Sequence, residues 1–226
     1  MNLLKPSTLD FLIDLEKNNN KEWFNNNRKR YIDAKSDFES FIQILINTIE
    51  PYWSLQPTHA KDCIYRIFRD VRFSKDKTPY KTWFSATIAP GGKKTHLASI
   101  NIRLNPSSES FIELGSCHLD PVQLKSLRNE IDYGPTSLLE FMSSKEFRKI
   151  FGSKLEGEKL KTIPRGFDKD HPHADLLKHK TLKVKYRFPP YSATHKKFTQ
   201  EFLEVFQKGY PFLEFINSAI SLEIVH

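Results

Sequence analysis

The first fifty residues repeat apolar side chains at the spacing of amphipathic helices. A short helix is predicted over residues 8–17, capped by Ser7, and three asparagines at positions 18–20 end it. A longer helix is predicted from Lys21 to just before Pro51, because its apolar positions recur at the spacing of one buried helical face. The apolar positions of this second helix are Phe38, Phe41, Ile42, Leu45, Ile46 and Ile49.

Hydrophobic and polar residues alternate in the middle of the chain, which is the pattern of β-strands. Residues 63–73 alternate without making either side purely apolar, so at least one side faces a polar cleft or solvent. Further strands are predicted at residues 83–88, 97–104 and 110–114, with turn-forming proline, glycine, asparagine and serine residues between them. The short connections indicate antiparallel pairing of successive strands.

Helical spacing returns after the predicted sheet. Asp120 and Pro121 are typical of a helix start, and this helix is predicted to run to about Ile131. Residues 152–175 are predicted to be irregular, and a short strand at residues 182–188 follows them. The other predicted helices cover residues 136–143, 145–151, 192–207 and 211–220.

This order of elements predicts one α+β domain covering residues 1–226. Helices fill residues 1–53, antiparallel strands fill residues 62–115, and residues 120–226 are mainly helical with one late strand. The expected fold is a central antiparallel sheet of about four to six strands, covered by helices from both ends of the chain.

The positive charge of the chain is concentrated around the predicted strands. The net charge is +8, and residues 61–104 hold ten Lys/Arg against three Asp/Glu. Such a localised field favours an anionic partner, either a small phosphate-bearing molecule or a nucleic acid. The alternative is a solvated face that only keeps the protein soluble.

Cysteine content and hydropathy indicate a soluble cytoplasmic protein. The two cysteines, Cys63 and Cys117, are too few for a disulfide framework and are expected to be buried thiols in a reducing compartment. The N-terminal residues form no apolar leader, and no apolar run reaches the length of a membrane span, so no membrane partner is expected. The oligomeric state is left open.

The densest cluster of charge is the segment Arg69–Lys81, which holds five cations, two acids and two aromatic residues. It connects two predicted strands, a position where scaffolds commonly carry binding residues. Arginine forks suit phosphate groups, lysines add mobile charges, and Tyr80 offers a ring for stacking. In the structural alternative, Arg69 or Arg72 pairs with Asp70 and the segment only forms a corner. The predicted ligand-binding residues here are Arg66, Arg69, Arg72, Ser74, Lys75, Lys77, Tyr80 and Lys81.

Two further segments contribute candidate residues. Near the start of the second helix, Arg28 is a predicted ligand contact, and Glu22 is a weak candidate for a catalytic base, as is Asp70. The structural alternative for Glu22 is a first-turn acid that matches the helix dipole. Arg165 is a further predicted contact that could reach toward the basic strands. The Asp and His residues at 168–175 have ligand chemistry for zinc or iron, but a polar loop entering a helix is the favoured interpretation, so no metal site is predicted.

Several short motifs, taken together, resemble a known family. They are Lys21-Glu-Trp-Phe24, Arg28, Tyr31, the Arg69–Lys81 segment and Pro164-Arg-Gly-Phe167. With them the chain resembles the mainly bacterial proteins grouped as domain of unknown function 2461, over roughly residues 5 to 220. The resemblance implies a fold shared across members and a common site, and it implies no activity.

These observations lead to one functional hypothesis and one alternative. The hypothesis is binding of a phosphate-bearing ligand or a nucleic acid through the basic strand and loop segment, with phosphate-ester or nucleotide chemistry if the protein is an enzyme. The alternative is a non-catalytic module that docks an acidic protein partner. The sequence contains no phosphate-binding glycine loop, dinucleotide-binding turn, serine nucleophile elbow or zinc-protease helix motif, and it identifies no cofactor.

Overall fold

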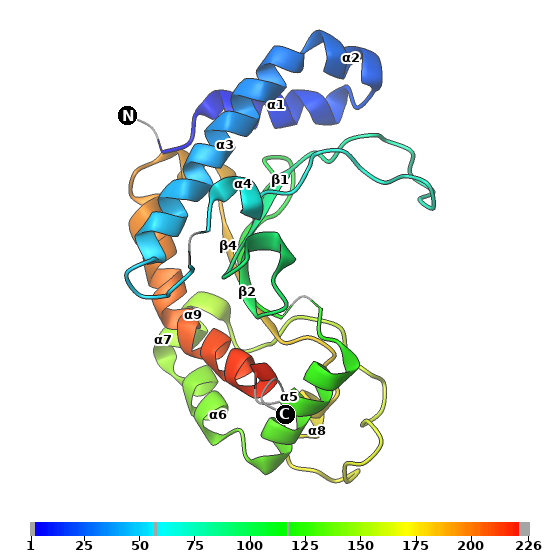
Figure 1. Cartoon of the computed structure of the whole chain (residues 1–226), viewed down its shortest axis with the longest axis vertical. Helices are drawn as coiled ribbons and strands as arrows, with labels where there is room; N and C mark the ends of the chain where they lie inside the picture. The colour runs from blue at the N-terminus through cyan, green and yellow to red at the C-terminus, as the bar shows by residue number, and fades with distance from the viewer. Residues whose placement is uncertain (1–2, 57, 117, 222–226) are drawn as a thin grey trace. The chain divides into compact units, whose positions relative to one another are not determined.

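The computed structural model describes residues 3–56, 58–116 and 118–221, and Figure 1 shows the chain coloured from its N-terminus to its C-terminus. The chain forms two compact units. Unit 1 contains Met1–Lys94, Asn101–Ile112 and Arg187–Glu204, and unit 2 contains Thr95–Ile100, Glu113–Tyr186 and Val205–His226. The prediction of a single folding domain stays a prediction.

The elements are those of an α+β protein, as the order of the sequence patterns predicts. Within the described residues, one open antiparallel sheet has the strand order β1-β2-β3-β4, so each strand pairs with its neighbour in the sequence. The strands are β1 (Phe84–Ile88), β2 (Ser99–Leu104), β3 (Ser110–Gly115) and β4 (Lys183–Phe188). The helices are α1 (Pro6–Lys17), α2 (Lys21–Asn26), α3 (Arg28–Ile49), α4 (Ala60–Cys63), α5 (Pro121–Tyr133), α6 (Thr136–Ser143), α7 (Lys145–Phe151), α8 (Ala174–Leu177) and α9 (Phe198–Ser221), with 3-10 turns η1 (Gly92–Lys94) and η2 (Pro190–Thr194).

Several predicted boundaries are confirmed. Helix α5 begins at Pro121, and the Asp120 carboxylate accepts hydrogen bonds of 2.8 Å from the backbone N–H groups of Val122 and Gln123. The Gln123 side chain in turn accepts from the Asp120 backbone N–H at 3.2 Å, which completes a capping box. Helices α6 and α7 have the predicted bounds.

The first helix has a different cap from the predicted one. Ser7 does not cap it, because the helix already begins at Pro6. Asp37 of α3 instead accepts a hydrogen bond of 2.8 Å from the Lys5 backbone N–H and one of 2.6 Å from the Thr8 hydroxyl. The prediction was wrong because the capping carboxylate comes from a residue distant in the sequence.

The second predicted helix is two helices, separated at Asn27. The Asn27 side-chain amide donates a 2.9 Å hydrogen bond to the Trp23 carbonyl. Asparagine side chains compete in this way for backbone groups that a continuous helix would use. Helix α3 therefore begins at Arg28, and it ends at Ile49, ahead of Pro51 as predicted.

The predicted strand over residues 63–73 is not formed, because Cys63 ends the short helix α4. The residues that follow make two isolated antiparallel bridges, Ile64 with Ala86 and Phe68 with Tyr80. A continuous strand cannot extend beyond the second bridge because residues 70–78 form a loop that is bonded through its own side chains.

The two predicted C-terminal helices, at residues 192–207 and 211–220, are also different. One helix, α9, covers Phe198–Ser221 with Pro211 inside it, while η2 covers Pro190–Thr194. Proline lacks the N–H group for an intrahelical bond and normally ends or kinks a helix. Helix α9 continues because it has buried apolar residues both before and after the proline, including Phe206 and Phe212.

Aromatic side chains form much of the core of unit 1. Phe38 of α3 stacks on Phe84 of β1 with ring centroids 5.1 Å apart, and Phe41 lies 5.8 Å from Phe198. These contacts hold the apolar face of α3 against β1 and against the first residue of α9. The polar residues on the other flank of α3 are thereby fixed in place beside α4.

Unit 2 has its own aromatic core. The ring of Phe147 lies 6.4 Å from that of Phe212 and 4.8 Å from that of Phe151. Gly209 of α9 allows a close approach here, because a Cβ atom at this position would lie 2.4 Å from Leu114. The part of α9 that belongs to unit 2 therefore packs closely on Leu114 and Phe151 at a point where a larger residue would clash.

The described cysteine is buried. Cys63 is a free thiol, and burial is the main cause that raises its pKa to about 11, so it is mostly a protonated, weakly nucleophilic thiol at neutral pH. The second cysteine, Cys117, lies outside the described residues. In the described ranges, no helix has the length and apolar character needed to cross a membrane.

Candidate functional site

The charged segment at residues 69–81, called the arm from here on, is the outer part of a two-stranded ribbon in unit 1. The Arg69 N–H donates to the Pro79 carbonyl at 2.9 Å, and the Lys81 N–H donates to the Ile67 carbonyl at 2.8 Å. Figure 1 shows the arm as the long turquoise hairpin that precedes β1. The arm therefore connects segments that pair through isolated bridges and backbone hydrogen bonds, and not the continuous strand that was predicted on its N-terminal side.

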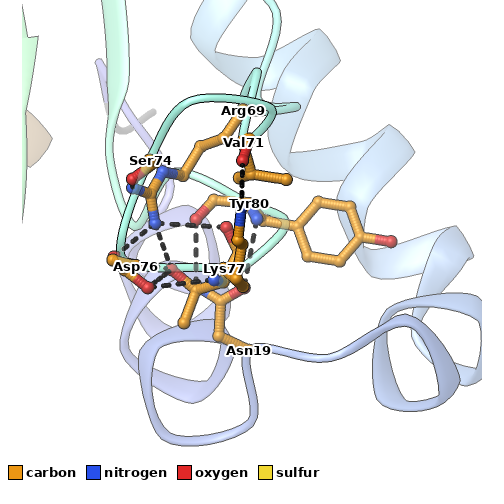
Figure 2. Close-up of polar contacts among 8 residues, drawn as sticks. Asn19, Arg69, Val71, Ser74, Asp76, Lys77 and Tyr80 are labelled. Carbon is orange, nitrogen blue, oxygen red and sulfur yellow. Dashed lines mark hydrogen bonds and ion pairs between the residues drawn. The ribbon is translucent and has the colours of Figure 1, made fainter.

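Arg69 is bonded inside the arm. Its guanidinium pairs with the Asp76 carboxylate and donates to the Thr78 hydroxyl and, at 3.1 Å, to the Thr78 carbonyl (Figure 2). A longer contact of 3.5 Å reaches the Ser74 hydroxyl. The pKa of Asp76 is lowered to about 2. The largest cause is the hydrogen bond from the Thr78 backbone N–H, and the second is the hydrogen bond from the Arg69 guanidinium. Arg69 thus closes the arm on itself.

Arg72 and Lys77 are also bonded to other groups within the arm. Arg72 grips Asp70 with two hydrogen bonds, Nε to Oδ1 at 3.0 Å and a terminal nitrogen to Oδ2 at 2.7 Å, and this pairing lowers the pKa of Asp70. Lys77 donates to the carbonyls of Val71 at 2.9 Å and Arg72 at 3.4 Å. The pairing of Arg72 with Asp70 matches the structural alternative considered for this segment.

Tyr80 anchors the arm to the N-terminal helices. Its ring is 5% exposed and stacks on Phe24 of α2, with centroids 3.9 Å apart and planes at 12°. The Asn19 side chain grips the Tyr80 backbone, donating to its carbonyl at 2.9 Å and accepting from its N–H at 3.1 Å. In Figure 2 the Tyr80 ring points away from the bonded side chains of the arm. A buried, stacked ring has no face left for a ligand.

The tip of the arm is exposed. Phe73 is 97% exposed, and Lys75 is exposed beside it. The only recorded ring contact of Phe73 within the described residues is the Arg72 guanidinium, whose carbon lies 5.9 Å from the ring centroid. An aromatic side chain with this exposure on a braced loop is available to a partner.

A pocket of about 590 Å³ lies in unit 1, lined in part by residues 64–66, which precede the arm, and we call it the cationic pocket. Four cations line it, and within the described residues none of the four is in ion-pair contact with a carboxylate. Its single acid is Glu39 of α3. The lining residues are Tyr31, Lys35 and Glu39 of α3, Lys61 of α4, Ile64, Tyr65 and Arg66, and Lys93 of η1.

The wall formed by η1 depends on a glycine. Lys93 donates to the carbonyls of Ile64 at 2.9 Å and Lys61 at 3.3 Å, which holds its ammonium group at the pocket. Gly92 has a φ of +61°, and a Cβ atom there would lie 2.7 Å from the Asp62 carbonyl oxygen. Only glycine combines this backbone conformation with so close an approach to α4.

Arg66 also belongs to a second group of cations, the cation row, which consists of Arg66, Lys81 and Arg103. Burial lowers the pKa of Lys81, and the charges of Arg66 and Arg103 lower it further. Among the described residues, no carboxylate pairs with any member of the row. Like charges that are held together without a counter-ion are typical of a site that binds an anion.

The remaining predicted residues lie outside the cationic pocket. Arg28 is exposed at the start of α3, close enough to oppose with its charge the rise in pKa that burial causes at Tyr31 and Tyr80. Glu22 is exposed in the first turn of α2, where an acid matches the helix dipole. Arg165 is exposed in a loop of unit 2.

The polar segment at residues 168–175 enters the short helix α8. His171 contacts Asp132 at 3.1 Å through Nε2, and its Nδ1 accepts from the His173 N–H at 3.0 Å. Across the described ranges, no group of three or more His, Cys, Asp or Glu is arranged to hold a metal ion.

Sequence reasoning missed four of the cations: Lys35, Lys61, Lys93 and Arg103. Three of them lie within residues 61–104, where the excess of positive charge was visible. These three lie outside the densest run of charge in the sequence, and they converge only through the fold. Lys35 gave no signal in the sequence, since it is one lysine on the polar flank of a long helix.

Comparison with known proteins confirms the predicted family. A family profile described as "Conserved hypothetical protein (DUF2461)" matches residues 7–215. The chain belongs to this family. Searches of curated proteins and of solved structures each found no match. The description of DUF2461 names no activity. The chemical evidence therefore comes from the cations of this chain.

Proposed function

We propose that this member of DUF2461 binds a phosphate-bearing ligand in the cationic pocket. The observation that carries the proposal is the convergence of Lys35, Lys61, Arg66 and Lys93 on one cavity with a single carboxylate. Unpaired cations repel one another and destabilise a fold unless an anion compensates them. A phosphate group supplies that compensation through charge-assisted hydrogen bonds.

The pocket residues take different parts in this binding. Arg66 offers a planar fork that suits two oxygens of one phosphate, whereas the three lysines act as point charges. Tyr31 and Tyr65 are the aromatic residues of the pocket wall. Glu39 can accept a hydrogen bond from a ligand hydroxyl group, and it discriminates against ligands that place a second phosphate at its position.

The proposal is one of binding rather than of a defined reaction. Of the two acids considered as catalytic bases, Asp70 is paired with Arg72, and Glu22 lies on α2 outside the pocket lining. A single carboxylate, Glu39, does not define a mechanism without a positioned partner.

A thermal-shift titration with pyrophosphate and with ATP at 50 and 150 mM salt tests the proposal. A ligand at a hundred times its Kd stabilises the folded state by about 2.7 kcal/mol, so the unfolding midpoint should rise by roughly 5–10 °C. The double variant Lys61→Gln/Arg66→Gln should lose most of this rise. The matched control is Lys17→Gln/Lys29→Gln, which removes two exposed lysines that do not line the pocket. An equal rise in all three proteins would contradict the proposal.

A second candidate function is the docking of an acidic protein partner by the arm. The observation that favours it is Phe73, exposed beside Arg72 and Lys75 at the tip. Exposed aromatic residues flanked by arginine are typical anchors of protein interfaces. If Phe73→Ser leaves phosphate binding unchanged but removes a partner captured by the wild type, this second function is supported.

A further inference from the structure

One face of the strand region in unit 1 carries aromatic rings and cations. Phe84, Ala86 and Ile88 of β1 are buried, and strand alternation places Ser85, Thr87 and the preceding Trp83 on the opposite face. On that face Ser85 and Trp83 are partly exposed, whereas Thr87 is buried. The bridge between Ile64 and Ala86 sets Tyr65 opposite Ser85, and therefore on that same face.

The neighbouring strand continues this face. Ile102 and Leu104 of β2 are buried, whereas Asn101 and Arg103 are partly exposed. The Thr87 hydroxyl donates to the Asn101 side chain at 2.6 Å. The Tyr65 hydroxyl lies 3.0 Å from Thr87 Oγ1, and it must be the donor because the threonine proton is already used. This chain of bonds fixes the Tyr65 ring over the strands.

The exposed ring of Tyr65 and the partly exposed ring of Trp83 each lie near a cation. The Lys81 ammonium lies 5.7 Å from the Tyr65 ring centroid, and the Arg103 guanidinium carbon lies 4.8 Å from that of Trp83. Arg103 also lies 5.0 Å from the ring centroid of Phe111. The two rings lie against the guanidinium, and no carboxylate or carbonyl of the described residues accepts a hydrogen bond from it, so its N–H groups can donate to a ligand.

The face is continuous in charge with the cationic pocket. Arg66 lines the pocket, and its charge acts on Lys81, as does the charge of Arg103. Tyr65 likewise borders the pocket and carries the first ring of the face. Positive charge therefore extends from a cavity onto an aromatic surface, which a compact phosphate ligand would leave unused.

We propose that the phosphate-bearing ligand is a single-stranded nucleic acid, which places one phosphate in the cationic pocket, runs along the cation row and stacks bases on Tyr65 and Trp83. The inference rests on the proposed function, since the pocket is the first contact. Alternating rings and cations are how proteins bind single strands without reading their sequence. A duplex hides the faces of its bases within the stack and cannot use the rings.

Fluorescence anisotropy with the full chain at 150 mM salt tests this inference. The probes are a labelled twelve-nucleotide oligo(dT), the matching oligo(U), a twelve-base-pair duplex, and a linear polyphosphate of similar charge that competes for binding. We expect both single strands to bind more tightly than the duplex and the polyphosphate by about tenfold or more, because each stacked base adds to affinity. A duplex that binds as tightly as the single strands overturns the inference.

Ring variants separate stacking from charge. Trp83→Leu and Tyr65→Leu should each weaken oligonucleotide binding by about fivefold to a hundredfold. Trp83→Leu, which changes no residue of the pocket lining, should leave polyphosphate competition unchanged. Trp83→Phe keeps a ring and should restore most of the affinity, and it also removes the indole fluorescence that a stacked base quenches. If oligonucleotide binding quenches tryptophan fluorescence as strongly in Trp83→Phe as in the wild type, bases do not stack on Trp83. Far-UV circular dichroism identifies any variant that fails to fold. If a leucine variant does not fold, the comparison of fluorescence quenching between the wild type and Trp83→Phe tests stacking instead.

Charge variants complete the design. Lys81→Gln and Arg103→Gln should each reduce the slope of log K against log salt by about 0.7 for a single strand, whereas Lys17→Gln/Lys29→Gln should leave it unchanged. If ring variants have no effect while Lys61→Gln/Arg66→Gln still abolishes pyrophosphate binding, the nucleic-acid inference fails and the proposed function stands. If the wild type binds neither pyrophosphate nor oligonucleotides, both fail.

Discussion

The arm and the cationic pocket contain the same kinds of side chain and use them in opposite ways. In the arm, Arg69 and Arg72 are paired with carboxylates, and Lys77 is bonded to backbone carbonyls. In the pocket and the cation row, no described carboxylate pairs with Arg66 or Lys81. Two acids lie within the arm itself, whereas the pocket cations come from four separate segments.

The difference teaches that a dense run of charge along a sequence tends to satisfy itself. Residues within a few positions of one another meet in the same loop, so acids and bases in one run become partners. Cations that come from different elements meet only after folding, and nothing local neutralises them. A dense charged motif can therefore stabilise the conformation of its own loop instead of binding a ligand.

The largest effect expected is on stability, from the anchor of the arm. Tyr80→Ala removes a ring stacked on Phe24 and should lower the free energy of unfolding by about 3–5 kcal/mol, measured by denaturation in urea. Tyr80→Phe keeps the stack and should change it by less than about 1 kcal/mol. A small loss of stability in Tyr80→Ala, together with loss of pyrophosphate binding, would place the ring in the ligand site instead.

The next effect compares one arginine from each region. Arg66→Gln should weaken pyrophosphate binding about tenfold, which corresponds to about 1.4 kcal/mol and to roughly one charge-assisted hydrogen bond. Arg72→Gln removes the same charge from the arm and should change the affinity by less than about twofold, because only the long-range field is altered. Isothermal titration calorimetry measures both. Equal losses would mean that the arm binds the ligand as well.

A smaller effect, on the unfolding midpoint, is expected from removing one charge of the cation row. The folded state lowers the pKa of Lys81 through burial and through Arg66 and Arg103, so the charged form is disfavoured in the folded protein. Its charge therefore opposes folding below the lowered pKa, and this penalty disappears as pH rises toward about 10.4, the ordinary value of lysine. Lys81→Met should raise the unfolding midpoint by roughly 1–3 °C at pH 7, and by less at pH 10. Lys29→Met is the exposed control and should not show this pH dependence.

The smallest effect is local to the arm. The pKa of Asp76 is lowered to about 2, first by the Thr78 backbone N–H and then by Arg69. The stabilising contribution of this carboxylate is therefore complete above about pH 4 and is lost as pH falls through about 2. The NMR signal of the Thr78 amide, 2.9 Å from Asp76 Oδ1, should titrate with that midpoint. In Arg69→Gln the midpoint should move up and stay below the ordinary value, and an unchanged midpoint would exclude Arg69 as a cause.

Much of the fold could be predicted from local patterns, because most elements obey local rules. The cap at Asp120 and the apolar face of α3 are decided by residues a few positions apart, and both are as predicted. The cap of α1 could not be predicted, since Asp37 supplies it from another helix. The strand expected at residues 63–73 failed because side chains in the arm replace the hydrogen bonds of a ladder.

The candidate site shows the same division. Arg66 and Lys81 were identified from the charged strand, and the structure places Arg66 at the pocket and Lys81 beside it. Lys35 and Arg103 could not be found, because one is a lysine on a helix flank and the other an arginine in an otherwise ordinary strand. Lys35 shares a cavity with residues of α4 and η1, and Arg103 lies beside the rings of Trp83 and Phe111. The fold brings these residues together from distant parts of the chain, and sequence spacing carries no trace of that.

The internal bonds of the arm have a consequence for proteolysis. The exposed tip offers trypsin the peptide bonds after Arg72 and Lys75, and such loop tips are normally the first places to be cut. A protease needs an extended segment of about ten residues in its cleft, which the arm can provide only if Arg69 and Lys77 release their partners. Trypsin should therefore cut the folded protein slowly after Arg72 and Lys75. The rate at which the fragments from these two cuts appear on a gel then reports how often the arm opens.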